Sequence, residues 1–155
     1  MEMVKKGTKM TYTFTLDQVN LIDLSWNNLQ GEIPNEITGL SALGTLNLSW
    51  NQLSGGIPED IVSMQQLETL DLSANHLSGS IPLSTTSITS LNYLNLSHNN
   101  LHGPIPSTNQ FGTFTDPSCF EGNPELCGKP LTMEIALYPE KKKWKGILKM
   151  TMSMK

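Results

Sequence analysis

The sequence predicts an α/β solenoid, a fold in which short turns of chain stack side by side. A pattern built on Leu-Ser-x-Asn recurs four times at an unbroken spacing of 24 residues, and each copy continues into Gly-x-Ile-Pro. The repeated asparagines are Asn27, Asn51, Asn75 and Asn99, and the Ile-Pro pairs begin at Ile33, Ile57, Ile81 and Ile105. A fixed period of this length is typical of a solenoid, because a single repeat cannot bury its apolar face alone.

The first element of each repeat is predicted to be a short strand. Apolar residues alternate with other residues up to each Leu-Ser pair, which places every second side chain on one face. The inward pairs are Ile22 and Leu24, Leu46 and Leu48, Leu70 and Leu72, and Leu94 and Leu96. We expect the four strands to form a parallel concave sheet, with neighbouring strands about 4.8 Å apart.

The second part of each repeat is predicted to turn and to return along the convex side. An inward asparagine can bond backbone groups that the turn leaves unpaired, while Gly permits unusual φ values and Pro fixes φ. Apolar residues spaced by three predict a short helical or 3₁₀ turn over 35–40 and 59–64. The third return segment, 83–88, is more polar and carries Thr85 where the others carry Ile, so we expect it to be looser.

Four regions are expected along the chain: a leader over 1–18, the four repeats over 19–106, a cap over 107–131 and a basic tail over 132–155. The alternating stretch 11–16 predicts a strand that pairs with the first repeat. After Pro106 the period stops, and the apolar end of a solenoid must be covered. Three phenylalanines are suited to cover it: Phe111, Phe114 and Phe120. We expect the tail to be disordered, with a membrane-surface or partner helix as the alternative.

The charge pattern disfavours nucleic acid as a partner. The formal net charge is −4, and all ten basic residues are lysines that lie toward the two ends. No Lys or Arg occurs between Met10 and Gly128, so the acidic repeats would repel phosphate groups. The acidic block favours a basic partner, mainly through the association rate. Simple solubility is an equally good explanation of the same pattern.

Motifs for catalysis and for membrane insertion are missing from the sequence. It has no Gly-rich phosphate loop, kinase motif, HExxH or G-x-S-x-G pattern, so we expect a protein that is not an enzyme and needs no cofactor or metal. No secretory leader opens the sequence, and no apolar run approaches the ~20 residues of a membrane span. As written, the chain is expected neither to enter the secretory route nor to contact a membrane.

The candidate binding site is the concave face of the predicted sheet. Outward positions of successive repeats form columns that combine aromatic and polar side chains, as protein interfaces favour. The residues expected to bind a partner are Asp23, Trp26, Asn47, Trp50, Asp71, Tyr93, Asn95 and His98. The alternative is that Trp26 and Trp50 cover neighbouring strands at the exposed end of the array.

Two kinds of covalent modification are predicted. Asn47 and Asn95 each begin an Asn-Leu-Ser sequence and are candidate glycosylation sites if the chain is secreted, although the repeat pattern itself generates this sequence. A glycan at either position would block the concave face. Cys119 and Cys127 could form a disulfide bond in an oxidising compartment.

The repeat Leu-x-x-Leu-x-Leu-Ser-x-Asn-x-Leu-x-Gly-x-Ile-Pro resembles the plant-specific class of leucine-rich repeats. Lys-Gly-Thr-Lys-Met-Thr-Tyr at 6–12, followed by Ile-Asp-Leu-Ser at 22–25, looks like the segment after the island region of plant receptor-like proteins. Asn-Gln-Phe-Gly-Thr-Phe at 109–114, with Gly-Asn-Pro-Glu-Leu-Cys-Gly-Lys-Pro-Leu at 122–131, looks like their C-terminal cap. The resemblance covers Val4 to Leu131 and implies a right-handed superhelix.

This resemblance implies a function in recognition. Members of the family are cell-surface receptors in defence or development, whose solenoid lies on the extracellular side of the plasma membrane and which recruit receptor kinases. The chain would then be a non-catalytic module that binds a protein or peptide ligand or a co-receptor kinase ectodomain. The repeats that would dock the co-receptor hold Asp71, Tyr93, Asn95 and His98.

The sequence also departs from the family pattern. The signal peptide, the N-terminal cap, further upstream repeats, the acidic juxtamembrane spacer and the membrane span are missing. The second cysteine that the family places shortly after the position of Cys127 is missing too, so Cys119 is either its partner or incidental. Two alternatives stay open: a soluble leucine-rich repeat inhibitor of secreted pectin-degrading enzymes, and a truncated gene product without independent function.

Overall fold

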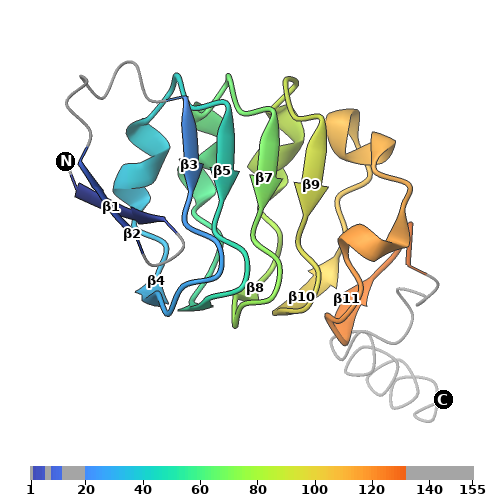
Figure 1. Cartoon of the computed structure of the whole chain (residues 1–155). Helices are drawn as coiled ribbons and strands as arrows, with labels where there is room; N and C mark the ends of the chain where they lie inside the picture. The colour runs from blue at the N-terminus through green and yellow to red at the C-terminus, as the bar shows by residue number, and fades with distance from the viewer. Residues whose placement is uncertain (1, 6–7, 12–19, 132–155) are drawn as a thin grey trace, which may run out of the picture.

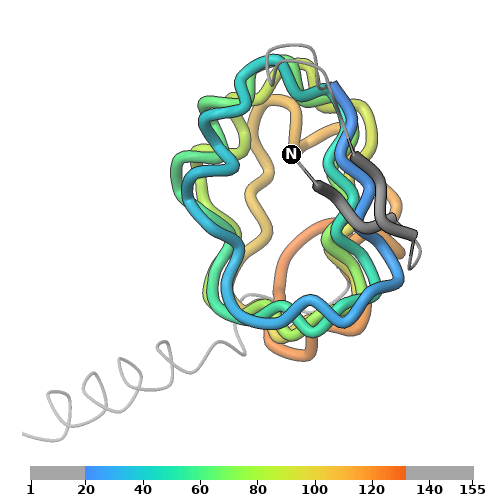
Figure 2. Tube along the Cα trace, turned by 60° about the vertical axis from the view of Figure 1, so that its left-hand side comes forward, coloured from blue at the N-terminus to red at the C-terminus, as the bar shows by residue number. Residues whose placement is uncertain are grey.

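Residues 20–131 wind into successive turns that superpose when the molecule is viewed along the stack (Figure 2). The computed structural model describes residues 2–5, 8–11 and 20–131. The strand predicted over 11–16, apart from Thr11, and the tail predicted over 132–155 lie outside the described residues. Ahead of the coil, β1 (Glu2–Lys5) and β2 (Thr8–Thr11) pair as an antiparallel hairpin that the sequence pattern did not predict.

The concave sheet is parallel and takes one three-residue strand from each repeat (Figure 1). Its strands are, in order, β3 (Leu21–Asp23), β5 (Thr45–Asn47), β7 (Thr69–Asp71) and β9 (Tyr93–Asn95). The central residues pair in one row: Ile22, Leu46, Leu70 and Leu94. All four are buried in the core. The predicted parallel sheet and its inward apolar row are therefore confirmed.

A second set of strands lies on the other edge of the coil, after the turn in each repeat. The sequence pattern did not predict these strands. These strands are β4 (Gln30–Glu32), β6 (Gln52–Ser54), β8 (Ser78–Gly79) and β10 (Asn100–Pro104), and they pair in parallel as β4–β6 and β8–β10. Beside them the repeated glycine has a positive φ, for example +73° at Gly55. Side chains with a Cβ rarely adopt this conformation, so the backbone path requires glycine here.

The convex side carries a 3₁₀ helix in each of the first three repeats: η2 (Asn35–Gly39), η3 (Glu59–Ser63) and η4 (Leu83–Ser87). Each helix begins after the proline of an Ile-Pro pair, which confirms the short turns predicted over 35–40 and 59–64. The expectation of a looser third segment is wrong, because η4 is as regular as the others. Thr85 is buried there, and its Oγ1 donates to the carbonyl oxygen of Pro82 at 2.6 Å, which satisfies the hydroxyl.

The repeated asparagines form a ladder of hydrogen bonds inside the coil. Nδ2 of Asn75 donates to two carbonyl oxygens in its own turn and to that of Leu48 in the preceding turn, and Oδ1 accepts from the amide of Leu53. Asn51 and Asn99 make the corresponding bonds. The predicted role of these side chains is confirmed, since buried backbone groups need a partner.

The coil continues for a fifth turn beyond the four repeats. Phe120 is fully buried 24 residues after Leu96, and Asn123 adds a further rung to the ladder: Nδ2 donates to the carbonyl oxygen of Leu96, and Oδ1 accepts from the amide of Leu101. The new elements are η5 (Asn109–Thr113), η6 (Pro117–Cys119) and β11 (Glu125–Cys127), and β11 pairs with β10. The backbone thus keeps its period past Pro106, where the leucine pattern ends.

The predicted phenylalanines close this end of the coil. Phe111 and Phe120 are buried, and Phe114 is partly buried against them. The ring of Phe111 meets Phe114 edge-on at a centroid distance of 5.8 Å and lies 6.4 Å from Phe120. Their expected burial is therefore confirmed.

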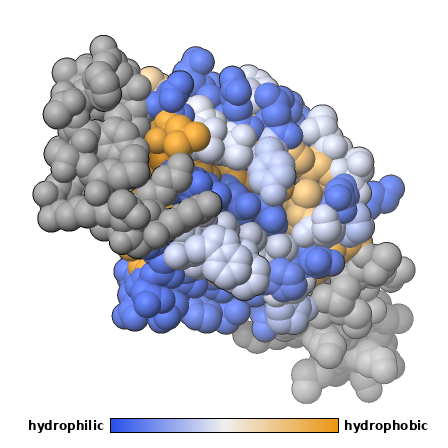
Figure 3. Space-filling view, viewed as in Figure 1, coloured by the Kyte–Doolittle hydropathy of each residue, from blue (hydrophilic) through white to orange (hydrophobic). Residues whose placement is uncertain are grey.

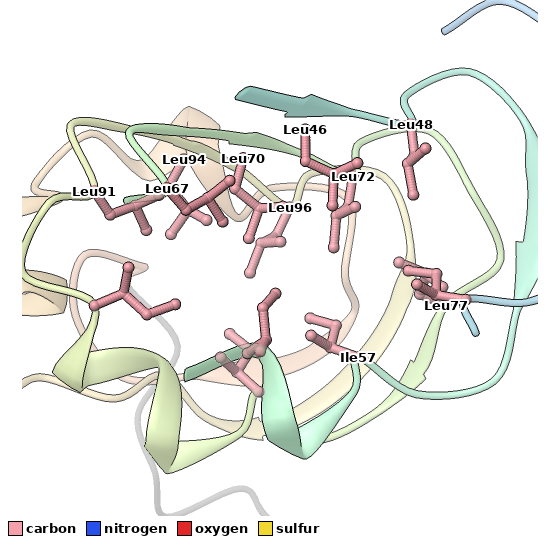
Figure 4. Close-up of a cluster of buried hydrophobic side chains, with 14 of the residues drawn as sticks. Leu46, Leu48, Ile57, Leu67, Leu70, Leu72, Leu77, Leu91, Leu94 and Leu96 are labelled. Atoms are coloured by element: carbon pink, nitrogen blue, oxygen red, sulfur yellow. The ribbon is translucent and has the colours of Figure 1, made fainter. Parts of the chain in front are cut away.

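The core lies between the concave strands and the rest of each turn (Figure 4). Leu46, Leu70 and Leu94 point inward from the strands, Ile57 approaches them from the opposite side, and Leu77 lies at one end of the cluster. At the first repeat Leu24 is only partly buried, whereas its equivalents in the later repeats are buried. The strand side chains that point away from this core are the ones that form the concave surface.

Candidate binding face

Figure 3 views the concave sheet from outside, where the side chains are mainly hydrophilic. The outward position at the start of each strand forms a row from Leu21 through Thr45 and Thr69 to Tyr93. Leu21 and Tyr93 are each 48% exposed. Large apolar side chains therefore stand at the two ends of this row, and small polar ones in the middle.

The next outward row helps to close the turns. Oδ1 of Asp71 accepts hydrogen bonds from the amide and the hydroxyl of Ser73, at 3.0 and 2.6 Å. Asp23, Asn47 and Asn95 make the same two bonds with the serine two residues later. Because such Asx turns stand in for a backbone turn, one side-chain oxygen of each of these four predicted binding residues is already engaged by the fold. Only the remaining side-chain atoms of this row can serve a partner.

Trp26 and Trp50 lie just beyond the strands rather than on them. Their φ is +56°, and Ala74 and His98 occupy the same place in the next two repeats with φ of +53° and +54°. For a residue with a Cβ this left-handed conformation costs roughly 1–2 kcal/mol. Strand alternation cannot reveal this departure, and the sequence analysis therefore missed it.

The two indole rings stack on each other. Their centroids lie 4.2 Å apart, and their planes are inclined by 7°. Trp26 is nevertheless 63% exposed and Trp50 50% exposed. The rings thus cover each other but leave half or more of each residue open to a partner.

A groove of about 730 Å³ is associated with these indoles. Its lining residues are Trp26, Asn27, Asn28, Trp50, Asn51, Gln52 and Ala74. The groove combines aromatic faces with carboxamide side chains and contains no charged residue. The site predicted from the sequence includes the two indoles but not Asn28 and Gln52, although these two residues share the same repeat spacing.

At the other end of the face, His98 approaches the cap. Its Nε2 lies 3.9 Å from Oε1 of Glu121, and both side chains are mostly exposed. A Cβ on Gly122 would collide with Nδ1 of His98, so the imidazole lies over the fifth turn. Glu121 was not predicted for this face, because the 24-residue spacing places it at the position of Ser97, which is buried.

Acidic side chains dominate the charge of the coil. Residues 20–131 contain one base, Lys129, and ten acids: Asp23, Glu32, Glu36, Glu59, Asp60, Glu68, Asp71, Asp116, Glu121 and Glu125. A surface with one sign of charge raises the encounter rate with partners of the opposite sign. This excess of acid complements a basic partner.

The disulfide bond predicted between Cys119 and Cys127 is not present, and both thiols are free. The backbone holds the two residues in different elements: Cys119 ends η6, where its carbonyl accepts from the amide of Leu96, and Cys127 ends β11, where its carbonyl accepts from the amide of Ile105. Burial raises the pKa of the Cys119 thiol, and the nearby charge of Asp116 raises it further. The uncharged thiol is therefore the favoured form of Cys119.

Within the described residues, no three His, Cys, Asp or Glu side chains gather as the ligands of a metal would. No helix in the described part of the chain is long and apolar enough to cross a membrane.

Comparisons with known proteins agree with this architecture. The family model Leucine Rich Repeat matches residues 18–40, 42–64, 66–88 and 90–123. The chain is similar to the BIR2 ectodomain from Arabidopsis thaliana, with 39% identity and a TM-score of 0.65 over 72% of this chain and 58% of that one. No curated protein matches the sequence.

Two further solved structures from Arabidopsis are complexes. A chain of the BIR3–SERK2 complex has 44% identity and a TM-score of 0.66, over 72% of this chain and 58% of that one. The HAESA receptor kinase ectodomain in complex with an IDA peptide hormone has 42% identity and a TM-score of 0.63, over 76% of this chain and 19% of that one. This chain therefore spans less than two thirds of the length of each of these proteins.

The repeat matches, the parallel concave sheet and the asparagine ladder all agree, and the fourth match extends to residue 123 in the fifth turn. The chain belongs to the leucine-rich repeat family, with repeats of the kind that build plant receptor ectodomains.

Proposed function

We propose that this chain is a non-catalytic protein-binding module of a plant cell-surface receptor-like protein that acts in defence or developmental signalling. Its concave face docks a receptor-kinase ectodomain or a protein or peptide ligand. The observation that carries this proposal is the exposure of Trp26, Trp50 and Tyr93 on a face whose inward residues already fill the core. Aromatic residues of this kind, at the centre of an interface, supply much of the binding energy.

Related structures support the kind of partner. The BIR3–SERK2 structure is a complex of two proteins, and the HAESA ectodomain is in complex with a peptide hormone. A coil of this length offers a short face, because four strands about 4.8 Å apart span only about 15 Å. That face is large enough to dock one part of a partner.

The proposed location is the extracellular side of the plasma membrane. In that compartment Asn47 and Asn95 would be candidates for glycosylation. In both residues Oδ1 accepts hydrogen bonds from the serine two residues later. These bonds do not use Nδ2, which is the atom that would carry a glycan. A glycan at Asn47 would stand within the sheet beside the indoles, so occupancy there would restrict the partner.

The test is binding of the full chain to an immobilised SERK2 ectodomain, measured by biolayer interferometry. We expect Trp50→Ala combined with Asp71→Ala to weaken binding at least about tenfold. Leu83→Ala is the matched control, since Leu83 is an exposed apolar residue (76%) on the convex helix η4 and should leave the affinity unchanged. If the double variant and the unmodified chain bind with equal affinity, the binding site does not lie on the concave face.

The same experiment separates the alternatives. Inhibition of a secreted pectin-degrading enzyme, without binding to the kinase ectodomain, would replace the receptor proposal with the inhibitor function. Binding to neither protein by a chain that is folded by circular dichroism would favour a product without independent function.

A further inference from the structure

One column of side chains on the coil has a gap. Trp26, Trp50, Ala74 and His98 occupy the same position in successive repeats and share the same left-handed backbone, with φ between +53° and +56°. Their Cα–Cβ bonds therefore leave the coil in a similar direction. Rings occupy the first, second and fourth places, and a methyl group occupies the third.

The first two rings show what this column does when it is filled. Their centroids lie 4.2 Å apart, close to the roughly 4.8 Å between neighbouring strands. A ring at the third place would extend the same stack. Ala74 instead leaves the face of Trp50 that turns toward it uncovered, and Ala74 lines the groove together with that indole.

The imidazole of His98 does not fill this gap. It lies over Gly122, where a Cβ would collide with it, and it is within 3.9 Å of the carboxylate of Glu121. Both contacts hold the ring toward the cap and away from Ala74. A ring at Ala74 would lie one strand spacing from Trp50, so the gap has room for at least one planar group stacked on that indole.

The chemistry around the gap favours a flat cation. Trp is the best aromatic partner for a cation, and a guanidinium group stacks on its face. Asp71 lies three residues before Ala74 in the same turn, and only one of its carboxylate oxygens is engaged by Ser73. The coil carries ten acids against Lys129 alone over residues 20–131. Carboxamide oxygens of the groove can accept further N–H donors.

We propose that the gap beside Ala74 is a slot for an arginine side chain of the bound protein or peptide, which stacks on Trp50 and turns its charge toward Asp71. This inference rests on the proposed function, because it names the chemistry of a partner for the same face. An aromatic side chain would fill the slot but gain nothing from the acidic field. A sugar ring could also stack on an indole, yet it is neutral and would gain nothing from the acidic field either.

The test uses the full chain labelled with ¹⁵N and the probe peptide acetyl-Gly-Arg-Gly-amide. The indole N–H signal of Trp50, assigned with Trp50→Phe, should shift on titration. The matching peptide with lysine should bind several-fold more weakly, because an ammonium group cannot stack as a plane. Asp71→Asn should weaken binding of the arginine peptide and leave binding of its neutral citrulline analogue unchanged.

The decisive variant is Ala74→Trp, which fills the slot. The chain already holds Trp in this backbone conformation at positions 26 and 50, so the variant should fold normally. It should lose affinity for the arginine peptide by at least about tenfold. Ala74→Ser keeps the gap and should retain binding.

The outcomes separate the slot from the proposed function. If the peptide binds as described while the SERK2 ectodomain does not, the slot stands and the partner is a different protein. If Ala74→Trp binds the arginine peptide as tightly as the unmodified chain, the slot is overturned even where SERK2 binding persists. A shift of the Trp50 signal with cellohexaose and none with the arginine peptide would also overturn it, in favour of a carbohydrate site.

Discussion

Nδ2 of Asn75 donates a hydrogen bond to the carbonyl oxygen of Leu48, one turn earlier in the coil, at 3.0 Å. The Oδ1 atom of the same side chain accepts from the amide of Leu53 at 2.9 Å. One buried amide group thus joins two turns whose backbones could not pair there directly. Asn27 occupies the same place in the first repeat, but among the described residues its Nδ2 donates only to the carbonyl oxygens of Leu24 and Ser25 in its own turn. The ladder is therefore stronger inside the coil than at its first rung.

Replacing the two asparagines should have unequal effects. Asn75→Ala leaves buried backbone groups of two turns without partners, at about 1–3 kcal/mol for each group. We expect it to lower the free energy of unfolding by at least about 2 kcal/mol, and Asn27→Ala by about 1 kcal/mol or less. Urea titrations of both variants, followed by circular dichroism, measure the difference. Equal losses would show that the bonds between turns contribute nothing.

Much of this architecture could be predicted from the sequence, because each repeat restates the same physical constraints. Alternation placed Leu46 and Leu70 inward, and the asparagine spacing predicted a hydrogen-bonded ladder. Those predictions depend on residue types that a pattern can show directly. The same regularity explains why the register of the concave sheet is confirmed.

The remaining features depend on geometry that residue type does not reveal. Phe120 stands where the earlier turns have a leucine, so the leucine pattern ends while the coil continues. Thr85 looks too polar for the convex core, but a bond within its own turn satisfies its hydroxyl. The left-handed conformation of Trp26 and Trp50 moves their rings from the strand to its end, where they meet groove residues that the concave-face pattern did not include.

The fifth turn predicts where the cap is most sensitive. Phe120 is fully buried, and Phe120→Ala should cost about 3–5 kcal/mol. Because each turn of a solenoid contacts only its neighbours, the damage should remain near the cap. Hydrogen exchange should show faster exchange over 101–127 and little change over 21–47. Phe114→Ala, at a partly buried ring, is the control and should have the smaller effect; the reverse order would show that Phe114 is the main closing residue.

The buried hydroxyl of Thr85 offers a stabilising change. Thr85→Val keeps the shape of the side chain and adds apolar surface in the place where other turns carry isoleucine. The carbonyl of Pro82 keeps a partner, since it also accepts from the amide of residue 85 at 3.1 Å. We therefore expect a gain of about 0.5–1 kcal/mol, measured as a higher midpoint in urea. A loss of stability would show that the hydroxyl contributes more than the added methyl group.

The cap also predicts how the reactivity of Cys119 depends on pH. Burial and the charge of Asp116 raise the pKa of this thiol above its ordinary value, so less thiolate is present at a given alkaline pH and alkylation is slower than for an exposed cysteine. Asp116→Asn should lower the pKa of Cys119 and speed its reaction with iodoacetamide near pH 8, because it removes the charge. The asparagine keeps an oxygen for the bond that Oδ1 of Asp116 accepts from the amide of Ser118 at 2.9 Å, so the turn should be preserved.

Peptide-resolved mass spectrometry over a pH series measures each rate, with Cys127 as the buried internal control. An unchanged profile for Cys119 in Asp116→Asn would leave burial as the only cause of the raised pKa.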